Sequence, residues 1–240
     1  MLLVWSLVPA DARPTVLAGS VASAKVLAIV GCMAAAWAFE PDDYLRRAWL
    51  LLAACTVGLF GRDLVALAGG AAVAQGVLAT VANGCSVAGT WMLARAWSVA
   101  GLEEERASRS WVLPAATVVV ALLVTGWPIV GDLRALSHGE AFAVVPLASD
   151  VADAIVLALL APLLRTTLAL EGGVLRWPWA LLTLGNLLWL AFDVLYGVLE
   201  LEGIEPGRVR VATDGLRVLA TLYLCSAGLA QRRAVRSTAG

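Results

Sequence analysis

Long apolar runs, separated by short charged segments, repeat along the whole chain. One transmembrane helix needs about 20 predominantly apolar residues, and these runs are long enough. The pattern predicts seven transmembrane helices, at residues 15–39, 47–69, 73–97, 111–131, 143–169, 178–200 and 211–231. We therefore expect an all-α, polytopic membrane protein in which residues 1–240 form a single transmembrane domain.

The composition strengthens this prediction. The chain is 61% hydrophobic and 15% charged, whereas soluble domains are roughly 45–50% apolar and 25% charged. Several tryptophans fall near the ends of the apolar runs, and indole rings prefer the headgroup region of a bilayer. We accordingly expect the following rings to mark the membrane surfaces: Trp37, Trp49, Trp97, Trp111, Trp127, Trp177 and Trp179.

Charge and residue types exclude several classes of function. A net charge of −1 provides no basic field for nucleic acid. The four cysteines are single and lie in apolar runs, so neither a disulfide framework nor a zinc site is expected. The single histidine, His138, falls in a loop. Because no nucleophile–base pair is visible, we expect neither an enzyme nor a cofactor or metal site.

Arginines are distributed unevenly between the two sets of loops. Ten lie on one side (Arg46, Arg47, Arg95, Arg106, Arg109, Arg165, Arg176, Arg232, Arg233, Arg236) and four on the other (Arg13, Arg134, Arg208, Arg210). Basic loops stay in the cytoplasm. This predicts an inner-membrane protein with its amino terminus outside and its carboxyl terminus in the cytoplasm. The first seven or so apolar residues form a poor signal peptide, and arginine outnumbers lysine, as in GC-rich bacterial genomes.

The first three predicted helices resemble the last three. A shift of 130 positions superposes Leu45-Arg46 on Leu175-Arg176, Trp49 on Trp179, Thr56 on Asn186, and Asp63 on Asp193. One further residue of shift superposes Asn83-Gly84 and Thr90 on Asp214-Gly215 and Thr221. These matches predict a parallel 3+1+3 duplication, with repeat A at 15–97, a linker helix at 111–131 and repeat B at 143–231.

Ionisable residues inside the predicted helices are the candidates for function, because an intramembrane charge is costly unless it is paired or faces water. With the predicted orientation, all of them fall in the outer half of the membrane. Helical spacing places them on shared faces with two asparagines. The candidate ligand- or ion-binding residues are Lys25, Arg62, Asp63, Asn83, Asp150, Asp153, Asn186, Asp193, Asp214 and Arg217.

These residues leave three interpretations open. They can form ion pairs that merely hold the two halves together, with Asp63 and Asp193 reaching the interface. They can line a ligand or ion site that is open to the outside. They can also handle protons, since adjacent acids such as Asp150 and Asp153 are the arrangement that a proton or cation site uses.

The carboxyl half resembles a class of sensor modules. Residues 156–200 carry two glycines, a tryptophan, a glycine and an aspartate, at Gly172, Gly173, Trp179, Gly185 and Asp193, and Gly228 and Gln231 later precede Arg232 and Arg233. Together these positions, which extend over about a third of the chain, are similar to the seven-helix modules that precede kinase or cyclase domains in bacterial and archaeal sensors. The resemblance implies a sensory function, and without an output domain the signal would pass to a partner protein.

Two other resemblances concern architecture alone. The 3+1+3 plan resembles that of the SWEET and PQ-loop transporters, but their Pro-Gln pair is missing, since Pro146 and Pro162 precede leucines. Seven helices with an external amino terminus also resemble the microbial rhodopsins. Those proteins need a lysine in the seventh helix for retinal, whereas the single lysine here, Lys25, lies in the first. We therefore expect no retinal.

We expect, first, a receptor- or sensor-like protein that binds a small ligand or cation in an outer polar pocket and signals through a membrane or cytoplasmic partner. One alternative is a small-solute transporter that uses the interface between the repeats. Another is a structural subunit of a membrane complex, in which small residues allow close helix contact. The residues in question are Gly58, Gly61, Gly84 and Gly89.

Overall fold

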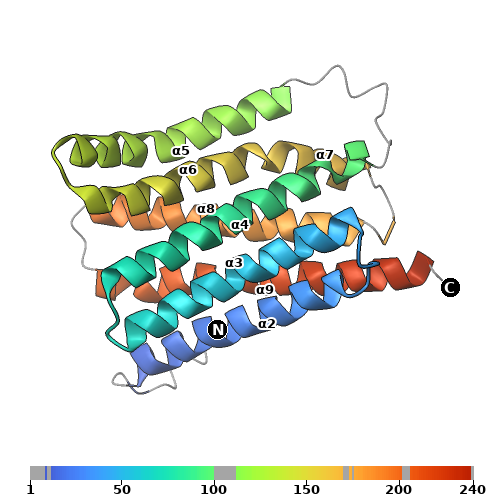
Figure 1. Ribbon diagram of the computed structural model, residues 1–240, viewed down its shortest axis with the longest axis horizontal. Helices are drawn as coiled ribbons and strands as arrows, with labels where there is room; N and C mark the ends of the chain where they lie inside the picture. Colours follow the sequence, from blue (N-terminus) through green and yellow to red (C-terminus); the bar gives the residue numbers. More distant parts are fainter. Residues whose placement is uncertain are drawn as a thin grey trace.

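The structure, a computed structural model, describes residues 9, 12–99, 112–169, 173–174, 176–201 and 206–238. This part of the chain is almost entirely helical and contains no strand, which confirms the all-α class. Its elements are α2 (Arg13–Ala36), α3 (Tyr44–Leu67), α4 (Ala72–Val99), α5 (Val112–Ser137), a 3₁₀ turn η2 (Ala141–Ala143), α6 (Val144–Ala158), α7 (Leu160–Ala169), α8 (Arg176–Leu201) and α9 (Pro206–Thr238) (Figure 1).

Six segments are long and apolar enough to cross a membrane, so the chain is a multi-pass membrane protein. They are Thr15–Ala36, Tyr44–Leu67, Ala72–Ala96, Pro114–Ser137, Ala141–Arg165 and Arg176–Leu195, and each matches one of the first six predicted crossings. The predicted seventh is also helical, within α9, but its described residues are less apolar. Asp214 and Arg217 near its start and Arg232 and Arg233 near its end account for this difference.

Local sequence sets several of the helix boundaries. The Asp43 side chain caps α3 by accepting a 2.7 Å hydrogen bond from the Leu45 N–H. Gly69, with φ +69°, follows the end of α3 in the left-handed conformation that glycine favours. Pro162 lacks the amide that would bond the carbonyl of residue 158. The predicted fifth crossing is therefore divided into α6 and α7 at Leu159.

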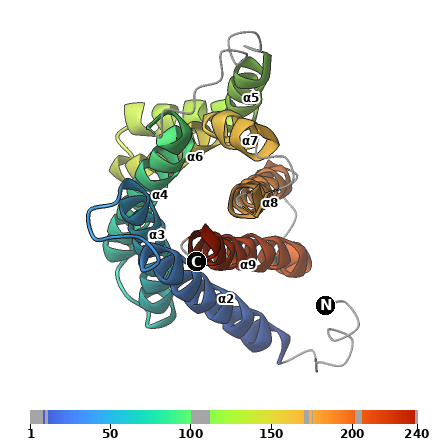
Figure 2. The same ribbon diagram turned by 90° about the vertical axis from the view of Figure 1, so that its right-hand side faces the viewer.

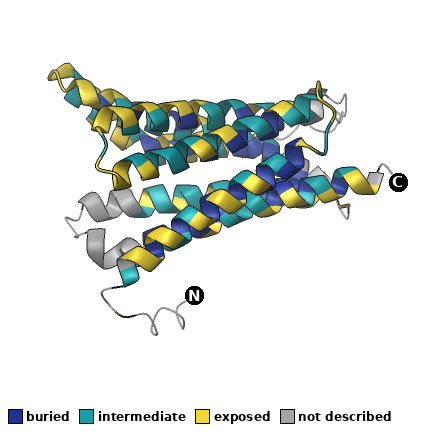
Figure 3. Ribbon diagram, turned by 60° about the horizontal axis from the view of Figure 1, so that its bottom comes forward, coloured by how far each residue is buried: buried dark blue, intermediate teal, exposed yellow. Residues whose placement is uncertain are grey.

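Five of the six candidate crossings form a ring together with α9, and the remaining one, α5, lies outside it. Looking along the bundle, the order is α2, α3, α4, the α6–α7 pair, α8 and α9, and α9 packs back against α2 (Figure 2). Helix α5 packs against α6 and contributes little to the ring. Its apolar side chains, including Leu122, Leu123 and Trp127, are exposed, and exposed residues also mark the outer faces of the other helices (Figure 3).

The two ends of the bundle differ in character. Helices α2, α4, α6 and α9 begin at one end, and α3, α5 and α8 finish there (Figure 1); we call it the α2 amino-terminal end. The apolar core lies toward the opposite end. It includes four of the largest buried side chains, with exposed fractions between 0% and 8%: Trp49, Leu93, Leu163 and Trp179.

The tryptophans correct one of the sequence expectations. Trp37, Trp127 and Trp177 are 61–70% exposed, as a membrane-surface position requires. Trp49 and Trp179 are only 1% and 8% exposed and lie in the core, so the prediction was wrong for these two rings. The ring closes around them, because their helices face inward at these positions. Trp97 and Trp111 lie outside the described side chains.

Small residues allow close helix contact at some of the expected places. A Cβ on Gly89 would lie 3.1 Å from the carbonyl oxygen of Ala48, and one on Gly58 would meet Ala82 at 3.0 Å. Gly61 is less tightly packed, and a Cβ on Gly84 would meet nothing within 4 Å. The closest approach joins α2 to α9, where the backbone at Gly31 lies directly against α9.

Candidate functional site

The ring encloses a cavity of about 390 Å³ in the half of the bundle toward the α2 amino-terminal end. Every ring crossing contributes to its lining and α5 does not. Its polar and charged lining residues are Lys25 of α2, Arg62 of α3, Asn83 and Ser86 of α4, Ser149 and Asp153 of α6, Asn186 and Asp193 of α8, and Arg217 of α9. We call this space the central cavity.

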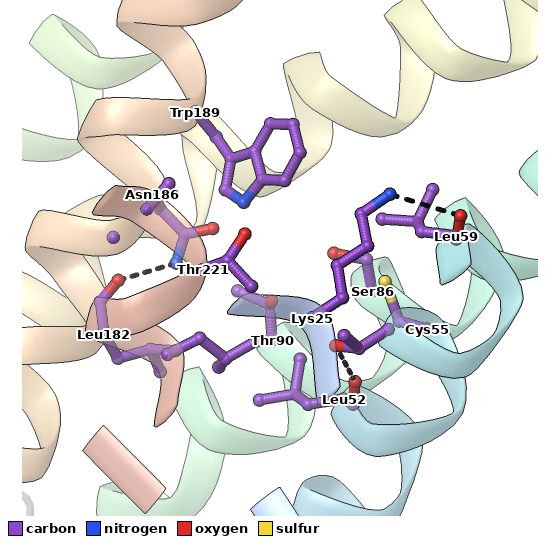
Figure 4. A pocket seen from close by; sticks show the side chains of 14 residues that line it. Lys25, Leu52, Cys55, Leu59, Ser86, Thr90, Leu182, Asn186, Trp189 and Thr221 are labelled. Atoms are coloured by element: carbon purple, nitrogen blue, oxygen red, sulfur yellow. Dashed lines mark hydrogen bonds between the residues drawn. The ribbon is translucent and has the colours of Figure 1, made fainter. Parts of the chain in front are cut away.

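A smaller lobe of about 60 Å³ continues the cavity toward the apolar core. Lys25, Ser86, Asn186 and Trp189 line both spaces, so the two are adjacent. Figure 4 shows the Trp189 ring and the Lys25 side chain projecting into the lobe from opposite sides. The remaining polar side chains of the lobe are three threonines, Thr56, Thr90 and Thr221.

Several polar side chains of the lobe form hydrogen bonds within their own helices, and Thr90 does not. Thr56 donates to the Leu52 carbonyl at 2.9 Å, and Asn186 donates to the Leu182 carbonyl at 2.9 Å. Thr90 is 1% exposed, and no described residue forms a hydrogen bond with its hydroxyl. Thr90 lines the lobe, and its hydroxyl can bond there to water or to a ligand.

An ion-pair network forms one wall of the central cavity. Lys25, which is 1% exposed, forms an ion pair with Asp63 and donates to the Leu59 carbonyl at 3.2 Å. The guanidinium of Arg62 pairs with Asp63 at 3.0 Å. Arg217 pairs with Asp214 at 3.1 Å and lies 3.9 Å from Asp63. The network thus ties α2 and α3 to α9.

Two acids of the lining have no ion-pair partner among the described residues. Asp153 and Asp193 line the cavity, and among the described residues neither has a hydrogen bond or a cationic nitrogen within 4.0 Å. Next to them, Asn83 donates to the Ser149 hydroxyl at 3.0 Å and joins α4 to α6.

Aromatic rings complete the lining on the α8 side. Trp189 and Phe192 meet edge to face, with ring centroids 5.7 Å apart, and both line the central cavity. The Arg217 guanidinium lies 5.4 Å from the centroid of the Phe192 ring. The cavity therefore presents cations, acids, neutral donors and aromatic surface together.

Most residues singled out from the sequence meet in this region. Asp63 and Asp214 act through their ion pairs with lining cations rather than by lining the cavity themselves. Asp150 lies elsewhere: it does not line the cavity and lies close enough to Asp132 of α5 for the two carboxyl groups to interact. Asp150 and Asp153, one turn apart on α6, lie close enough to interact with each other, but only Asp153 lines the cavity.

Sequence reasoning missed several lining residues: Cys55, Ser149, Trp189 and Phe192. For Trp189 a signal was present, since Asn186, Trp189 and Asp193 are spaced by three and four residues and share a helix face. Cys55 and Ser149 are small and common in apolar helices, so only the ring shows that they face inward.

The lining suits recognition of a small polar molecule by ionic interactions, hydrogen bonds and ring contacts. Within the described ranges, no group of three or more histidine, cysteine, aspartate or glutamate side chains is arranged to hold a metal ion. No known protein family, no curated protein and no solved structure matches the chain.

Proposed function

We propose that the chain is a receptor- or sensor-like membrane protein that binds a small ligand or cation in the central cavity and signals through a partner protein. The cavity itself carries the proposal. Its volume of about 390 Å³ falls within the roughly 300–1,000 Å³ typical of small-molecule sites. Its lining combines aromatic surface with a few polar and charged groups, which is the usual make-up of such sites.

The position of the cavity explains how binding would be sensed. A molecule inside it contacts all six ring crossings at once. Because a ligand shifts a conformational equilibrium only through different contacts in the two states, a site shared by every ring helix is well placed to change how the helices pack. The loose resemblance of residues 156–200 to sensor modules agrees with this function.

A parallel 3+1+3 duplication is part of the proposal. A two-fold relation would exchange α2, α3 and α4 with the α6–α7 pair, α8 and α9 and leave α5 unmatched, and the ring has this order. Two sets of proposed equivalents, Thr56 with Asn186 and Thr90 with Thr221, line the same small lobe. The linker helix would then serve to keep both repeats in the same orientation.

The proposed topology places the amino terminus outside and the carboxyl terminus in the cytoplasm of a bacterial inner membrane. Helix α2 begins at the end of the bundle nearest the cavity, and α9 finishes at the other end (Figure 1). With seven crossings, the cavity would therefore lie toward the outside, where a receptor meets its ligand.

A carrier is the second candidate, because the cavity lies between the two proposed repeats, where transporters bind their substrates. Alternating access also needs a route to the other side. The core around Trp49, Leu163 and Trp179 closes that half of the bundle, and the ion pairs of the cavity wall tie α2, α3 and α9 together. Uptake into proteoliposomes separates the two, since only a carrier accumulates solute.

Ligand-induced thermal stabilisation tests the proposal. The purified full chain, in lipid nanodiscs, is heated with members of a library of polar metabolites, and hits are repeated on two variants. Ser86→Phe adds a ring where the central cavity and the lobe adjoin, whereas Ser23→Phe adds the same ring on the exposed face of α2. We expect the shift to vanish in Ser86→Phe and to persist in Ser23→Phe. Equal shifts in both variants would show that binding occurs elsewhere.

A further inference from the structure

We infer that the ligand of the central cavity is a small organic ammonium ion. Its nitrogen would lie between Asp153 and Asp193, and its apolar portion would lie against Trp189. This inference rests on the proposed function, since it names the chemical class of the ligand for the same cavity.

The charges of the cavity provide the first argument. Among the described residues, Lys25, Arg62 and Arg217 pair with the carboxylates of Asp63 and Asp214. The acids on the opposite wall, Asp153 and Asp193, have no cation within 4.0 Å among the described residues. Ionising two neighbouring carboxyl groups inside a membrane is costly without a cation, and a bound monocation would offset that charge.

The size of the cavity favours an organic cation over a bare ion. A space of about 390 Å³ is far larger than a metal ion needs, and hard cations require six or more closely placed oxygen ligands. Two carboxylates and a few neutral oxygens around a space of this width do not form such a cage. They do suit an ammonium group, which has few hydrogens to donate and carries an apolar substituent.

The Trp189 ring supplies the apolar and cation-binding surface. It lines both the central cavity and the small lobe and projects into the space between the helices (Figure 4). Tryptophan is the best aromatic partner for an ammonium ion within about 6 Å. Trp189 and Asp193 are one turn apart on α8, so one ligand can contact both.

The small lobe supplies an independent indication that a ligand enters this space. The Thr90 hydroxyl lines the lobe, is 1% exposed, and has no hydrogen-bond partner among the described residues. Lys25 and Asn186 line both spaces, so the lobe with Thr90 lies next to the cavity that holds the acids. A polar group on the ligand would satisfy this hydroxyl.

The cationic wall is less suited to hold an anion. The ammonium group of Lys25 already contacts Asp63 and the Leu59 carbonyl, and Arg217 pairs with Asp214 and contacts Phe192. The Arg217 Nε is buried and has no hydrogen-bond partner among the described residues. An anion would compete with the carboxylates that already pair with these cations.

Three probes of nearly equal shape and different charge test the inference: benzylamine, benzyl alcohol and benzoate. Binding to the full chain in nanodiscs is measured at pH 7 by calorimetry. We expect benzylamine to bind and the other two not to bind. Asp153→Asn and Asp193→Asn should each weaken benzylamine binding roughly ten- to a hundredfold, the effect of losing one charged hydrogen-bond partner. Asp42→Asn, in an exposed loop at the far end, is the matched control and should change nothing.

The outcomes separate this inference from the proposed function. Unchanged benzylamine affinity in both asparagine variants, verified as folded by circular dichroism, would overturn it. Binding of benzoate that is lost in Arg217→Gln would also overturn it, while leaving a ligand-binding cavity intact. If no probe binds to the wild type, the ammonium inference fails, and the metabolite screen with Ser86→Phe still decides the proposed function by itself.

Discussion

The contact between α2 and α9 at Gly31 provides a quantitative test of the ring. A Cβ placed on Gly31 would lie 2.6 Å from the Cys225 carbonyl oxygen and 2.7 Å from the Cys225 Cα, whereas ordinary contact begins at 3.4 Å. Gly31→Ala therefore requires α2 and α9 to separate by about 0.8 Å at this point. The obstacle is backbone, so no side chain can rotate to make room.

The expected cost follows from a matched comparison on the same helix. Both Gly31→Ala and Gly19→Ala gain the same helix propensity, up to about 1 kcal/mol. A Cβ on Gly19 meets nothing within 4 Å, so the difference between the two variants is the overpacking cost alone. Overpacking in a well-packed core costs about 1–3 kcal/mol. We expect the upper part of this range, because a gap of 0.5–1 Å also forfeits roughly a quarter to a half of each dispersion contact along the seam.

Reversible unfolding by SDS in mixed micelles, followed by tryptophan fluorescence, measures this difference. Gly228→Ala points back at the Gly31 backbone, so a single separation of the helices would relieve both clashes. The double variant should then cost less than the sum of the two single variants. If Gly31→Ala is as stable as Gly19→Ala, or if the two costs simply add, then α2 and α9 do not meet at these glycines.

Three further predictions concern the cavity and the core. Asp63→Asn should lower the free energy of unfolding by about 3–5 kcal/mol, because it leaves the buried Lys25 ammonium without its carboxylate. Lys25→Met should lower it less in the same SDS titration. A larger loss of stability in Lys25→Met than in Asp63→Asn would contradict the pairing. Ser149→Cys, in a background without other cysteines, should react with a membrane-impermeant thiosulfonate added to right-side-out vesicles, since this residue lines the cavity; protection from the outside and reaction from the inside would invert the topology. Trp49→Ala should cost about 3–5 kcal/mol and Trp37→Ala no more than about 0.5 kcal/mol, because the two rings are 1% and 70% exposed; similar thermal stability of both variants would place Trp49 outside the core.

Hydropathy identified the crossings well because lipid imposes a simple requirement. Backbone amides and carbonyls have no water to bond within hydrocarbon, so every apolar run of sufficient length forms a helix. The predicted 47–69 crossing corresponds to Tyr44–Leu67, and 178–200 to Arg176–Leu201. The division of the fifth crossing at Leu159 was foreseeable from Pro162 but was not predicted, since hydropathy averages over the local break.

Polar positions were less fully determined by the sequence. Lys25 and Asp63 were identified as candidates because charges in apolar helices need partners, and they do pair with each other. Spacing along α6 could not separate Asp153, which lines the cavity, from Asp150, which approaches Asp132. Which acid faces the cavity depends on where α5 packs, and that contact joins segments far apart in the chain.

Residue types and their spacing are enough to predict that this protein is helical, that it crosses a membrane several times, and that its apolar helices carry charged residues. Those properties depend on residue type and on spacing within single helices. Only the packing of the helices shows that α2, α3, α4, α6–α7, α8 and α9 close into a ring with α5 outside, and that Trp49 and Trp179 face the core. It also brings Asp153 and Asp193 into one cavity, where neither has a paired cation among the described residues. These facts depend on how each helix is rotated about its own axis relative to its neighbours. Lipid is equally apolar on every side and does not favour one rotation, so the contacts between helices set it.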